Sequence, residues 1–535
     1  MSTIPQLNGR ARLRRGLCFV IAFAILIGIF FRFYNISHKT FWEDEIIGTV
    51  RMLGYTEAEI VKAAPTFHTA RDIQRYFHVA KLSNGGERGL AATIKSLTLE
   101  DPQHTPIFYI VNRLWVEHAG TSVAALRTMS AVFGAFALVM MFLLARELSD
   151  SRLFAWIATA LLAVSPFQVL YAQEAREYTL WSVTILASSA LLLRAVRLGT
   201  RWSWTAYAAC CVLSMYVFPL SALLIASHGV YLIAGDDLRR RASGISYLAA
   251  SGSACVLFLP WLISSDLHSG VRGLSVVLAD KLSLKNVILA FLRDVKSSLV
   301  DFGFFGSHRL RLVSFLVGLT TTGLVGYALF VLRKGGDHKI RDMVFSMMAV
   351  TALPLVAHDV FFRGDLVLQA RYFIPLYIGA LLALANVLTG LLAAGPRLEA
   401  IGAAAFSFLL AIGMVSDARS SQATTWWNKD DERSPKVAAI INRSENPLVI
   451  GDRGTSRVLG LSFYLDPGVA LRVNLHCDNC GVSPSVRAHL DANISRYSVF
   501  SLGGTALDLA LPVLEIGVKT YPSDRAPLNM FLAAR

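Results

Sequence analysis

The chain has 535 residues, of which 54% are hydrophobic and only 16% are charged, and its mean hydropathy is +0.51. A soluble globular chain of this length would carry more charge, so the composition predicts a polytopic membrane protein. The formal net charge is +14, but the arginines cluster in short segments between apolar runs, which indicates membrane topology rather than nucleic-acid binding. We therefore expect membrane lipids, and no nucleic acid, among the partners.

Eleven apolar runs are long enough to cross a bilayer. They lie at about residues 16–34, 122–145, 152–170, 176–197, 202–216, 218–234, 243–263, 309–332, 342–358, 371–393 and 398–415. No small-residue cleavage site follows the first run, so we expect an uncleaved anchor. The two runs around Pro219 leave a second interpretation open, which is a single kinked helix.

Basic residues predict the orientation of these spans. With the N-terminus inside, the short inner loops hold seventeen arginines and lysines, whereas the short outer turns hold three. This excess follows the positive-inside rule. An odd number of spans then places the C-terminus outside, and three segments face outward: residues 35–121, residues 264–308 and the tail from 416.

The first outer segment is long and polar but contains helical patterns. Residues 41–52, 70–82 and 90–99 each have helical periodicity. Helices of this size beside a membrane are expected to lie along its surface, with Phe41 and Trp42 at headgroup depth.

The second outer segment contains one amphipathic helix. Its predicted apolar face carries Leu284, Val287, Ile288, Phe291 and Leu292. Its charged residues lie largely off that face, and they are Lys285, Arg293, Asp294 and Lys296. Two interpretations stay open, a mobile lid and an ordinary surface connector.

The tail differs in composition, because glycines, prolines and charges return after the last apolar run. Its predicted elements are two strands at 448–450 and 513–518 and a helix at 434–442. The chain is therefore predicted to have a transmembrane domain over residues 1–415 and a small outer α/β domain over residues 416–535. Within the tail, Cys477 and Cys480 favour a structural disulfide over half of a zinc site.

An acidic cluster follows the first span almost immediately, as Trp42-Glu43-Asp44-Glu45. A carboxylate near lipid is costly unless it is paired, and such groups tend to mark functional sites. Asp44 and Glu45 have an alternative interpretation, since acids are also favourable in the first turn of a helix.

Two more polar groups face outward in the predicted topology. Asp101 and His104 lie near the end of the first outer segment, in a motif whose prolines, Pro102 and Pro106, mark a rigid entry to the next helix. Glu174 and Tyr178 are four residues apart at the start of the fourth span and would share a helical face. Each group alone also fits an ordinary solvated loop or an interfacial anchor.

Two of the three basic residues in the short outer turns are Arg176 and Arg371. Arg371 is followed by Tyr372 at the start of the tenth span. Topology disfavours them there, and an anionic lipid headgroup would explain them, because a guanidinium binds phosphate oxygens in a fork and stays charged.

Carboxylates and arginines at one membrane face would suit glycosyl transfer from a polyprenyl-phosphate sugar. The attacking hydroxyl must lose a proton to a base, and the departing lipid phosphate must be stabilised by positive charge. The apolar bundle would hold the polyprenyl chain. The sequence contains no glycine-rich phosphate loop and no nucleotide-binding motif.

Five motifs in order resemble those of the GT-C membrane glycosyltransferases. They are Trp42-x-Asp44-Glu45, Asp101-x-x-His104-x-Pro106-x-x-Tyr109, Ser165-Pro166 with Gln173-Glu174-Ala175-Arg176-x-Tyr178, Leu259-Pro260-Trp261, and Arg371-Tyr372. The pattern is similar to the bacterial branch related to protein O-mannosyltransferases, the lipid A aminoarabinose transferase and the Rgt-type galacturonosyltransferases. The resemblance covers residues 16–415 and is strongest over residues 40–180.

The resemblance implies a role for each matching residue. Asp44 matches the catalytic acidic residue of the first outer loop and Glu45 its neighbour, while Asp101 and His104 match a motif near the acceptor or the sugar. The residues implied to border the donor and its phosphate are Glu174, Arg176, Tyr178, Arg371 and Tyr372. One departure is Thr105, which stands where the family commonly has the first proline of His-Pro-Pro.

The resemblance leaves metal dependence open, because some relatives use a divalent metal and others do not. Asp101 and His104, with His68 and His78, would be candidate ligands, but their spacing is not diagnostic. No cofactor is therefore assigned.

We interpret the sequence as a mainly α, GT-C-like transmembrane bundle with juxtamembrane helices and a small α/β domain. The expected function is inverting transfer, at the outer face of a bacterial inner membrane, from a polyprenyl-phosphate sugar to a glycolipid, lipid A-like, protein or other cell-envelope acceptor. Two alternatives stay open: a lipid-sugar flippase or exporter without chemistry, and an O-antigen ligase or polymerase that uses diphosphate-linked glycans. The sequence lacks the repeat symmetry that transporters tend to show.

Overall fold

The computed structural model describes residues 4–77, 88–235, 241–265, 284–303, 308–335, 337–362, 364, 366–429, 434–451, 455–473, 498–502, 513–515 and 530–533. Contacts divide the chain into two compact units, which are described separately. The first contains Met1–His38, Asp101–Phe108 and Leu126–Ala423, and the second contains Lys39–Glu100, Tyr109–Ala125 and Thr424–Arg535. The predicted division at residue 415 into a membrane domain and an outer domain stays a prediction.

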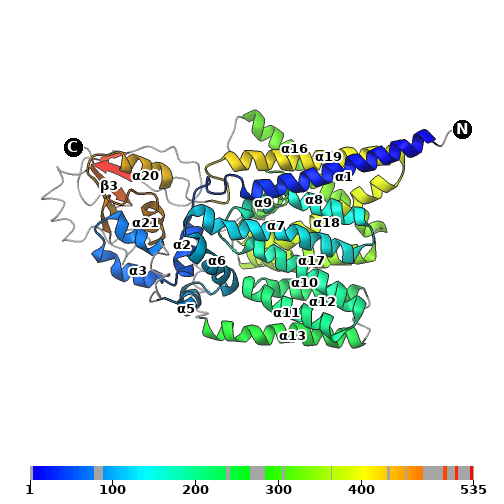
Figure 1. Cartoon of the computed structure of the whole chain (residues 1–535), viewed down its shortest axis with the longest axis horizontal. Coiled ribbons are helices and arrows are strands. Elements are labelled where there is room, and N and C mark those ends of the chain that lie inside the picture. The colour runs from blue at the N-terminus through cyan, green and yellow to red at the C-terminus, as the bar shows by residue number, and fades with distance from the viewer. Residues whose placement is uncertain are drawn as a thin grey trace. The chain divides into compact units, whose positions relative to one another are not determined.

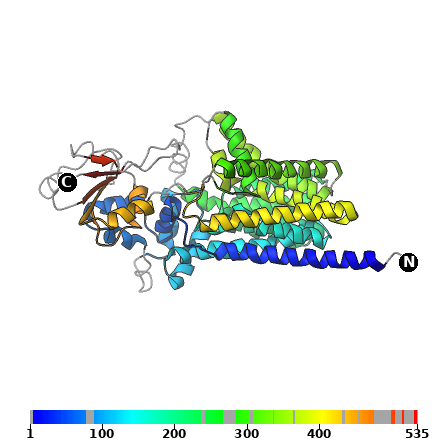
Figure 2. The same ribbon diagram turned by 90° about the horizontal axis from the view of Figure 1, so that it is seen from above.

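The first unit is a bundle whose long helices run side by side (Figures 1 and 2). Its helices are α1 (Ile4–Phe33), α8 (Arg152–Ala163), α9 (Pro166–Ala172), α10 (Tyr178–Leu198), α11 (Arg201–Val217), α12 (Ser221–Ala234), α13 (Arg241–Ser264), α15 (Leu284–Ser297), α16 (His308–Gly335), α17 (His338–Phe362), η5 (Leu366–Leu368), η6 (Ala370–Phe373), α18 (Ile374–Ala393) and α19 (Pro396–Gln422). Two further helices, α6 (Pro106–Ala119) and α7 (Val123–Leu148), include residues of both units. The predicted mainly α fold is confirmed.

The predicted spans correspond to helices, although not all have full length. Among the described residues, eight helices are long and apolar enough to cross a membrane, namely α1, α7, α10, α13, α16, α17, α18 and α19. A ninth span would be the pair α8 and α9, which is bent by 58°. The runs on either side of Pro219 are two helices, α11 and α12, and these have only 17 and 14 residues.

A buried arginine stabilises the bend between α8 and α9. Carbonyls released by a break inside an apolar bundle need donors from the protein. The guanidinium of Arg32, on α1, donates from Nη1 to the carbonyls of Gly28 and Ala163, each at 2.7 Å, and from Nη2 to the carbonyl of Leu162 at 3.2 Å. The negative charge of Asp417, on α19, also acts on Arg32.

Two glycines let the neighbouring helices reach this bend. A Cβ atom on Gly28 of α1 would overlap the Ala163 carbonyl, and one on Gly413 of α19 would overlap the Val164 carbonyl. Close approach of backbones explains the choice of glycine at both positions.

Replacing Arg32 by methionine is expected to lower the free energy of unfolding by about 3–5 kcal/mol, because three carbonyls lose their donor and a buried acid loses its counterion. Denaturant titration of the purified protein in detergent measures this. The control Arg197→Met removes an exposed ion pair with Glu147 at 2.8 Å and should cost less than about 1 kcal/mol. Equal losses in the two variants would contradict the assignment.

The second unit contains a five-stranded sheet in the order β2-β1-β3-β5-β4. The strands are β1 (Pro447–Gly451), β2 (Ala470–Val473), β3 (Ser498–Leu502), β4 (Val513–Glu515) and β5 (Met530–Ala533), and the helices of the tail are α20 (Ser434–Asn442) and α21 (Thr455–Ser462). β1 is parallel to β2 and β3, and β5 is antiparallel to β3 and β4. The predicted α/β character of the tail is confirmed. Residues 516–518, Cys477 and Cys480 lie outside the described residues.

The first outer segment belongs to the same unit as this sheet. Its helices are α2 (Glu43–Met52), α3 (Glu57–Ala63), η1 (Ala64–Thr66), α4 (Ala70–Gln74), η2 (Arg75–Phe77) and α5 (Leu90–Glu100). The backbone N–H of Leu471 donates to the His68 carbonyl at 2.8 Å, and that of Ala70 donates to the Val469 carbonyl at 2.9 Å. The segment therefore continues the sheet beyond β2. Residues 78–82, predicted to be helical, lie outside the described residues.

The structure buries Phe41 and Trp42 inside the protein, and their expected position at headgroup depth stays a prediction. They are 1% and 4% exposed. The ring of Phe41 lies 5.0 Å from that of Phe463, and its backbone N–H donates to the Tyr464 hydroxyl at 2.6 Å. Both aromatic residues belong to the core of the second unit.

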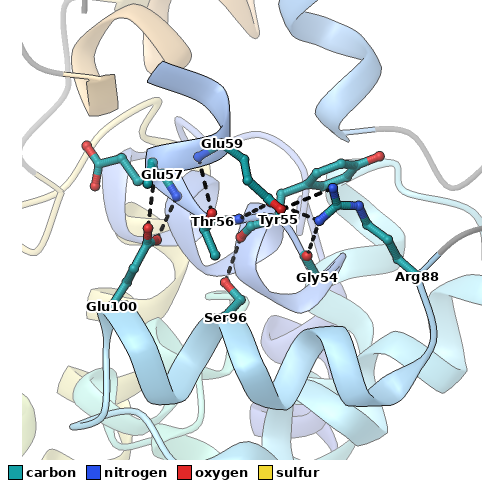
Figure 3. A network of polar contacts seen from close by, with 9 residues as sticks. Gly54, Tyr55, Thr56, Glu57, Glu59, Arg88, Ser96 and Glu100 are labelled. Atoms are coloured by element: carbon teal, nitrogen blue, oxygen red, sulfur yellow. Dashed lines mark hydrogen bonds and ion pairs between the residues drawn. The ribbon is translucent and has the colours of Figure 1, made fainter. Parts of the chain in front are cut away.

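A polar network joins α3 and α5 (Figure 3). The Glu100 carboxylate, at the end of α5, accepts from the backbone N–H of Glu57 at 2.6 Å and so caps α3. Arg88 pairs with Glu59 at 2.8 Å, and its guanidinium lies 4.3 Å from the centre of the Tyr55 ring. These contacts fix the helices of the first outer segment against one another.

Candidate functional site

The site of the first unit centres on the turn between α9 and α10. α9 ends at Ala172, α10 begins at Tyr178, and the residues between them are buried. The side-chain amide of Gln173 donates to two carbonyls at the end of α1, each at 2.7 Å. The hydroxyl of Ser130, on α7, donates to the carbonyl of Arg176 at 3.1 Å. Neighbouring helices thus hold the turn at both ends.

Arg176, His104 and Glu177 form a buried cluster in this turn. Nη2 of Arg176 lies 2.7 Å from Nε2 of His104, and Nδ1 of His104 lies 2.7 Å from Oε1 of Glu177. Because a guanidinium can only donate, Nε2 accepts, and Nδ1 then carries the proton and donates to Glu177. Asp101 approaches the same ring, with Oδ2 3.8 Å from Nε2. The geometry therefore favours the His104 tautomer that donates from Nδ1 to Glu177 and accepts at Nε2 from Arg176.

Glu177 stays ionised throughout the physiological pH range. Burial would raise the pKa of its carboxyl, but the charge of Arg176, whose Nε lies 3.6 Å away, and the hydrogen bond from His104 lower that pKa to about 2. A lowered pKa stabilises the fold above the ordinary value of 4.5, and this contribution is lost only as the pH falls toward 2.

Arg371 joins the site through an aromatic ring. Its guanidinium carbon lies 5.4 Å from the centre of the Tyr178 ring, and that of Arg176 lies 5.9 Å from the same ring. Tyr372 lies 5.9 Å from the Arg371 guanidinium carbon and 5.7 Å, ring to ring, from Phe218, which also contacts Tyr178. Two guanidiniums from distant parts of the sequence thus meet at one tyrosine.

The structure corrects the expected position of Glu174. The spacing of Glu174 and Tyr178 predicts one helical face, but α10 begins only at Tyr178, so Glu174 lies in the preceding turn. Glu174 is fully buried, and its carbonyl accepts from the Arg176 backbone N–H at 2.7 Å. Its place as a donor ligand stays a prediction.

Another motif supports the turn that carries Asp101 and His104. The backbone N–H of His104 donates to the Asp101 carbonyl at 2.9 Å, and Nε1 of Trp261, from Leu259-Pro260-Trp261, donates to the Pro102 carbonyl at 3.1 Å. Thr105, which replaces the usual proline, is buried directly before α6 begins at Pro106. The turn is therefore ordered without the missing proline.

The acidic pair Asp44 and Glu45 lies in the first turn of α2, in the second unit. Glu45 is fully buried, and its Oε2 lies 3.1 Å from Nζ of Lys429, which is buried as well. Nζ of Lys429 also lies 5.6 Å from the centre of the Trp42 ring. Asp44 is only partly buried, so of the two acids it is the more accessible.

The sequence interpretation missed two charged residues, Glu177 and Lys429. Glu177 lies inside a recognised motif, and its position directly beside Arg176 and Tyr178 was a usable signal. Lys429 lies close after the last span in a tail with many charges, and no local pattern distinguishes it. Its pairing with Glu45 depends on the tertiary structure alone.

Asp101 and His104 do not fit a metal site in this arrangement. Both ring nitrogens of His104 already have partners, in Glu177 and Arg176. In the part of the chain that the structure describes, no group of three or more histidine, cysteine, aspartate or glutamate side chains is placed to hold a metal ion.

Together, the helical bundle and the α/β unit have the fold of the GT-C membrane glycosyltransferases. ArnT from Cupriavidus metallidurans, in the apo state, matches with a TM-score of 0.52 at 12% identity, covering 97% of this chain and 98% of that one. The same protein bound to undecaprenyl phosphate matches with a TM-score of 0.48 at 12% identity, covering 96% and 97%. An oligosaccharyltransferase from Archaeoglobus fulgidus matches with a TM-score of 0.48 at 12% identity, covering 90% of this chain and 68% of that one.

These likenesses concern the fold. No protein-family model and no curated protein sequence matches the chain. The expected fold is thus confirmed, while the activity is argued below from the residues.

Replacing Glu177 by glutamine is expected to lower the free energy of unfolding by about 3–5 kcal/mol, because the buried Arg176 charge loses its anion. Denaturant titration in detergent measures the loss. Glu147→Gln is the matched control, since Glu147 pairs with the exposed Arg197 at 2.8 Å and should cost less than about 1 kcal/mol. Since the pKa of Glu177 is about 2, the difference between the two variants should not change between pH 5 and pH 8.

A double-mutant cycle tests the pair Glu45 and Lys429. Each single change, Glu45→Gln or Lys429→Met, should cost about 3–5 kcal/mol because it leaves one charge buried without its partner. The double variant should lose less than the sum of the two, by about 1–3 kcal/mol. Additive losses would show that the two charges do not stabilise each other.

Proposed function

We propose that this protein is an integral-membrane glycosyltransferase that moves a sugar from a polyprenyl-phosphate donor to a hydroxyl of a glycolipid or other cell-envelope acceptor. The observation that carries the proposal is the meeting of Arg176 and Arg371 at the Tyr178 ring, at 5.9 and 5.4 Å. Two guanidiniums in an apolar bundle suit a phosphate that is attached to a lipid chain.

The arginines would stabilise the leaving group. As the acceptor oxygen bonds to the anomeric carbon, the bond between that carbon and the phosphate oxygen breaks, and its electrons pass to the lipid phosphate. Arg176 and Arg371 would bind the growing negative charge in surroundings of low dielectric, where such interactions are strong. One in-line displacement inverts the anomeric centre.

Asp44 would be the base that takes the proton of the acceptor hydroxyl. It lies in the first turn of α2 and is more accessible than Glu45, whose carboxylate is paired with Lys429. Glu45 would then support the turn of α2 rather than accept a proton. Asp101 and His104 would border the sugar or the acceptor, with His104 also orienting Arg176.

The donor class has support from the fold. The bundle includes at least eight helices with the length and composition of membrane spans. ArnT from Cupriavidus metallidurans, whose fold this chain shares, has also been solved with undecaprenyl phosphate bound. We infer that a polyprenyl phosphate carries the sugar, and that transfer takes place at the outer face of a bacterial inner membrane.

Purified protein in liposomes should transfer sugar from one of a panel of undecaprenyl-phosphate sugars to a lipid acceptor. Asp44→Asn should lower turnover at least 100-fold, as loss of a general base does. Arg371→Gln should weaken both donor binding and turnover. The matched control is Glu43→Gln, an acid of the same helical turn, which should keep turnover within about twofold.

Other outcomes would point elsewhere. A folded Asp44→Asn variant with full turnover would remove Asp44 as the base. Movement of a fluorescent lipid-linked sugar across the bilayer without transfer would favour a flippase. Preference for diphosphate-linked glycans would favour a ligase or polymerase.

A further inference from the structure

Helix α15 buries one acidic side chain, Asp294, and leaves part of its apolar surface exposed. The sequence predicts an apolar face that includes Ile288 and Leu292, but both are about half exposed. The structure buries Val287, which belongs to the predicted face, together with Ala290 and Asp294, and the three lie on one face at helical spacing. The helix therefore buries Val287 at one edge of its predicted apolar face and leaves Ile288 and Leu292 of that face about half exposed.

Asp294 is buried in a place that suits a neutral carboxyl. It is 1% exposed, its Oδ1 accepts from Nε of Arg293 at 3.0 Å, and its Oδ2 has no hydrogen-bond partner among the described residues. The hydroxyl of Tyr377, on α18, is also buried without a partner in the described part of the chain, and the charge of Asp294 acts on it. A buried carboxylate oxygen without a partner is costly, and protonation reduces that cost.

α15 packs on the segment that carries Arg371. The ring of Phe291, on α15, meets that of Phe373, at the end of η6, edge-on at 5.8 Å. On α17, Oδ2 of Asp359 accepts from the backbone N–H of Val367, in η5, at 2.6 Å. α15 therefore contacts η6 through Phe291, and the end of α17 holds η5 through Asp359.

We propose that Asp294 is a positioning residue for Arg371: its neutral carboxyl keeps α15 docked on η5 and η6, and its ionisation weakens that docking. The inference rests on the proposed function only for the role of Arg371. The docking of α15 is a property of the chain that can be measured without any substrate.

Among the described residues, Arg293 pairs with Asp294 on α15, and the charge of Asp294 acts on Tyr377 of α18. Lys296, also on α15, interacts with the charge of Asp301, and on α17, which packs against α15, His358 pairs with Asp359 at 3.1 Å. Burial raises the pKa of Asp294 to about 7, and the charge of Arg293 opposes this rise. Because the raised pKa favours the protonated form in the docked state, docking weakens as the pH rises from 3.8 to about 7 and then levels off.

Hydrogen exchange of the α15 amides, measured by mass spectrometry on the full chain in nanodiscs, tests the proposal. After correction for intrinsic exchange rates, protection of residues 284–297 should fall by up to tenfold per pH unit between pH 5 and about pH 7 and then become constant. Asp294→Asn, which cannot ionise, should keep its protection across the whole range. Constant protection in the unmodified protein would overturn the proposal, as would an unchanged pH dependence in Asp294→Asn.

Two further variants separate a proton effect from a merely structural one. Arg293→Gln removes the charge that opposes the high pKa, so the pH at which protection becomes constant should move upward. Asp342→Asn is the matched control, because Asp342 also pairs with the preceding arginine, Arg341, at 2.8 Å, and it should leave the α15 profile unchanged. If Asp294→Asn does not fold, Arg293→Gln provides the test. A pH dependence of α15 protection in that variant equal to that of the unmodified protein would overturn the proposal.

An activity measurement separates this inference from the proposed function. In the transfer assay, the KM for the donor should rise between pH 5 and pH 7 in the unmodified protein and stay constant in Asp294→Asn. If protection of α15 falls with rising pH but no transferase activity is found, the inference about α15 is supported and the proposed reaction is contradicted.

Discussion

A charge inside an apolar bundle must find partners within the protein, because lipid and packed side chains cannot solvate it. This constraint explains the arrangement of the first unit. Arg32 donates hydrogen bonds to carbonyls at the bend of α8 and α9 and interacts with the charge of Asp417. Arg176 donates to His104 and lies beside the Glu177 carboxylate. Each arginine lies next to a break in a helix, where backbone groups and charge compensate one another. The bend and the site are therefore parts of one pattern of buried polar contacts.

At the proposed site, contacts within the protein fix the arrangement of the charged side chains. His104 forms hydrogen bonds with Arg176 on one side and Glu177 on the other, so contacts within the protein set the orientation of this guanidinium. Arg371 comes much later in the sequence and approaches the Tyr178 ring from a short helix, η6. Preorganised positive charge in a dry site is an effective way to stabilise a departing anion.

The sequence predicted those features that depend on local patterns. Each predicted span corresponds to a helix, or to the bent pair α8 and α9 for residues 152–170. A positive charge in a predicted outer turn needs an explanation, and this points to Arg176 and Arg371. Spacing alone could not show that Glu177, rather than Glu174, contacts His104, since periodicity does not show where α10 begins. The partner of Glu45 and the burial of Phe41 depend on residues from the tail, which no local pattern relates to the first outer segment.

The pairing of Thr69 with Ala470 bears on how the protein is made. The sheet is closed on its β2 side by a piece of chain that is synthesised long before the strands it joins. That piece therefore lacks its pairing partner until the tail has been synthesised. Until then both surfaces expose unpaired backbone, which attracts foreign strands. Biogenesis of this protein is thus most vulnerable during the interval in which the bundle is already inserted and its sheet is still unfinished.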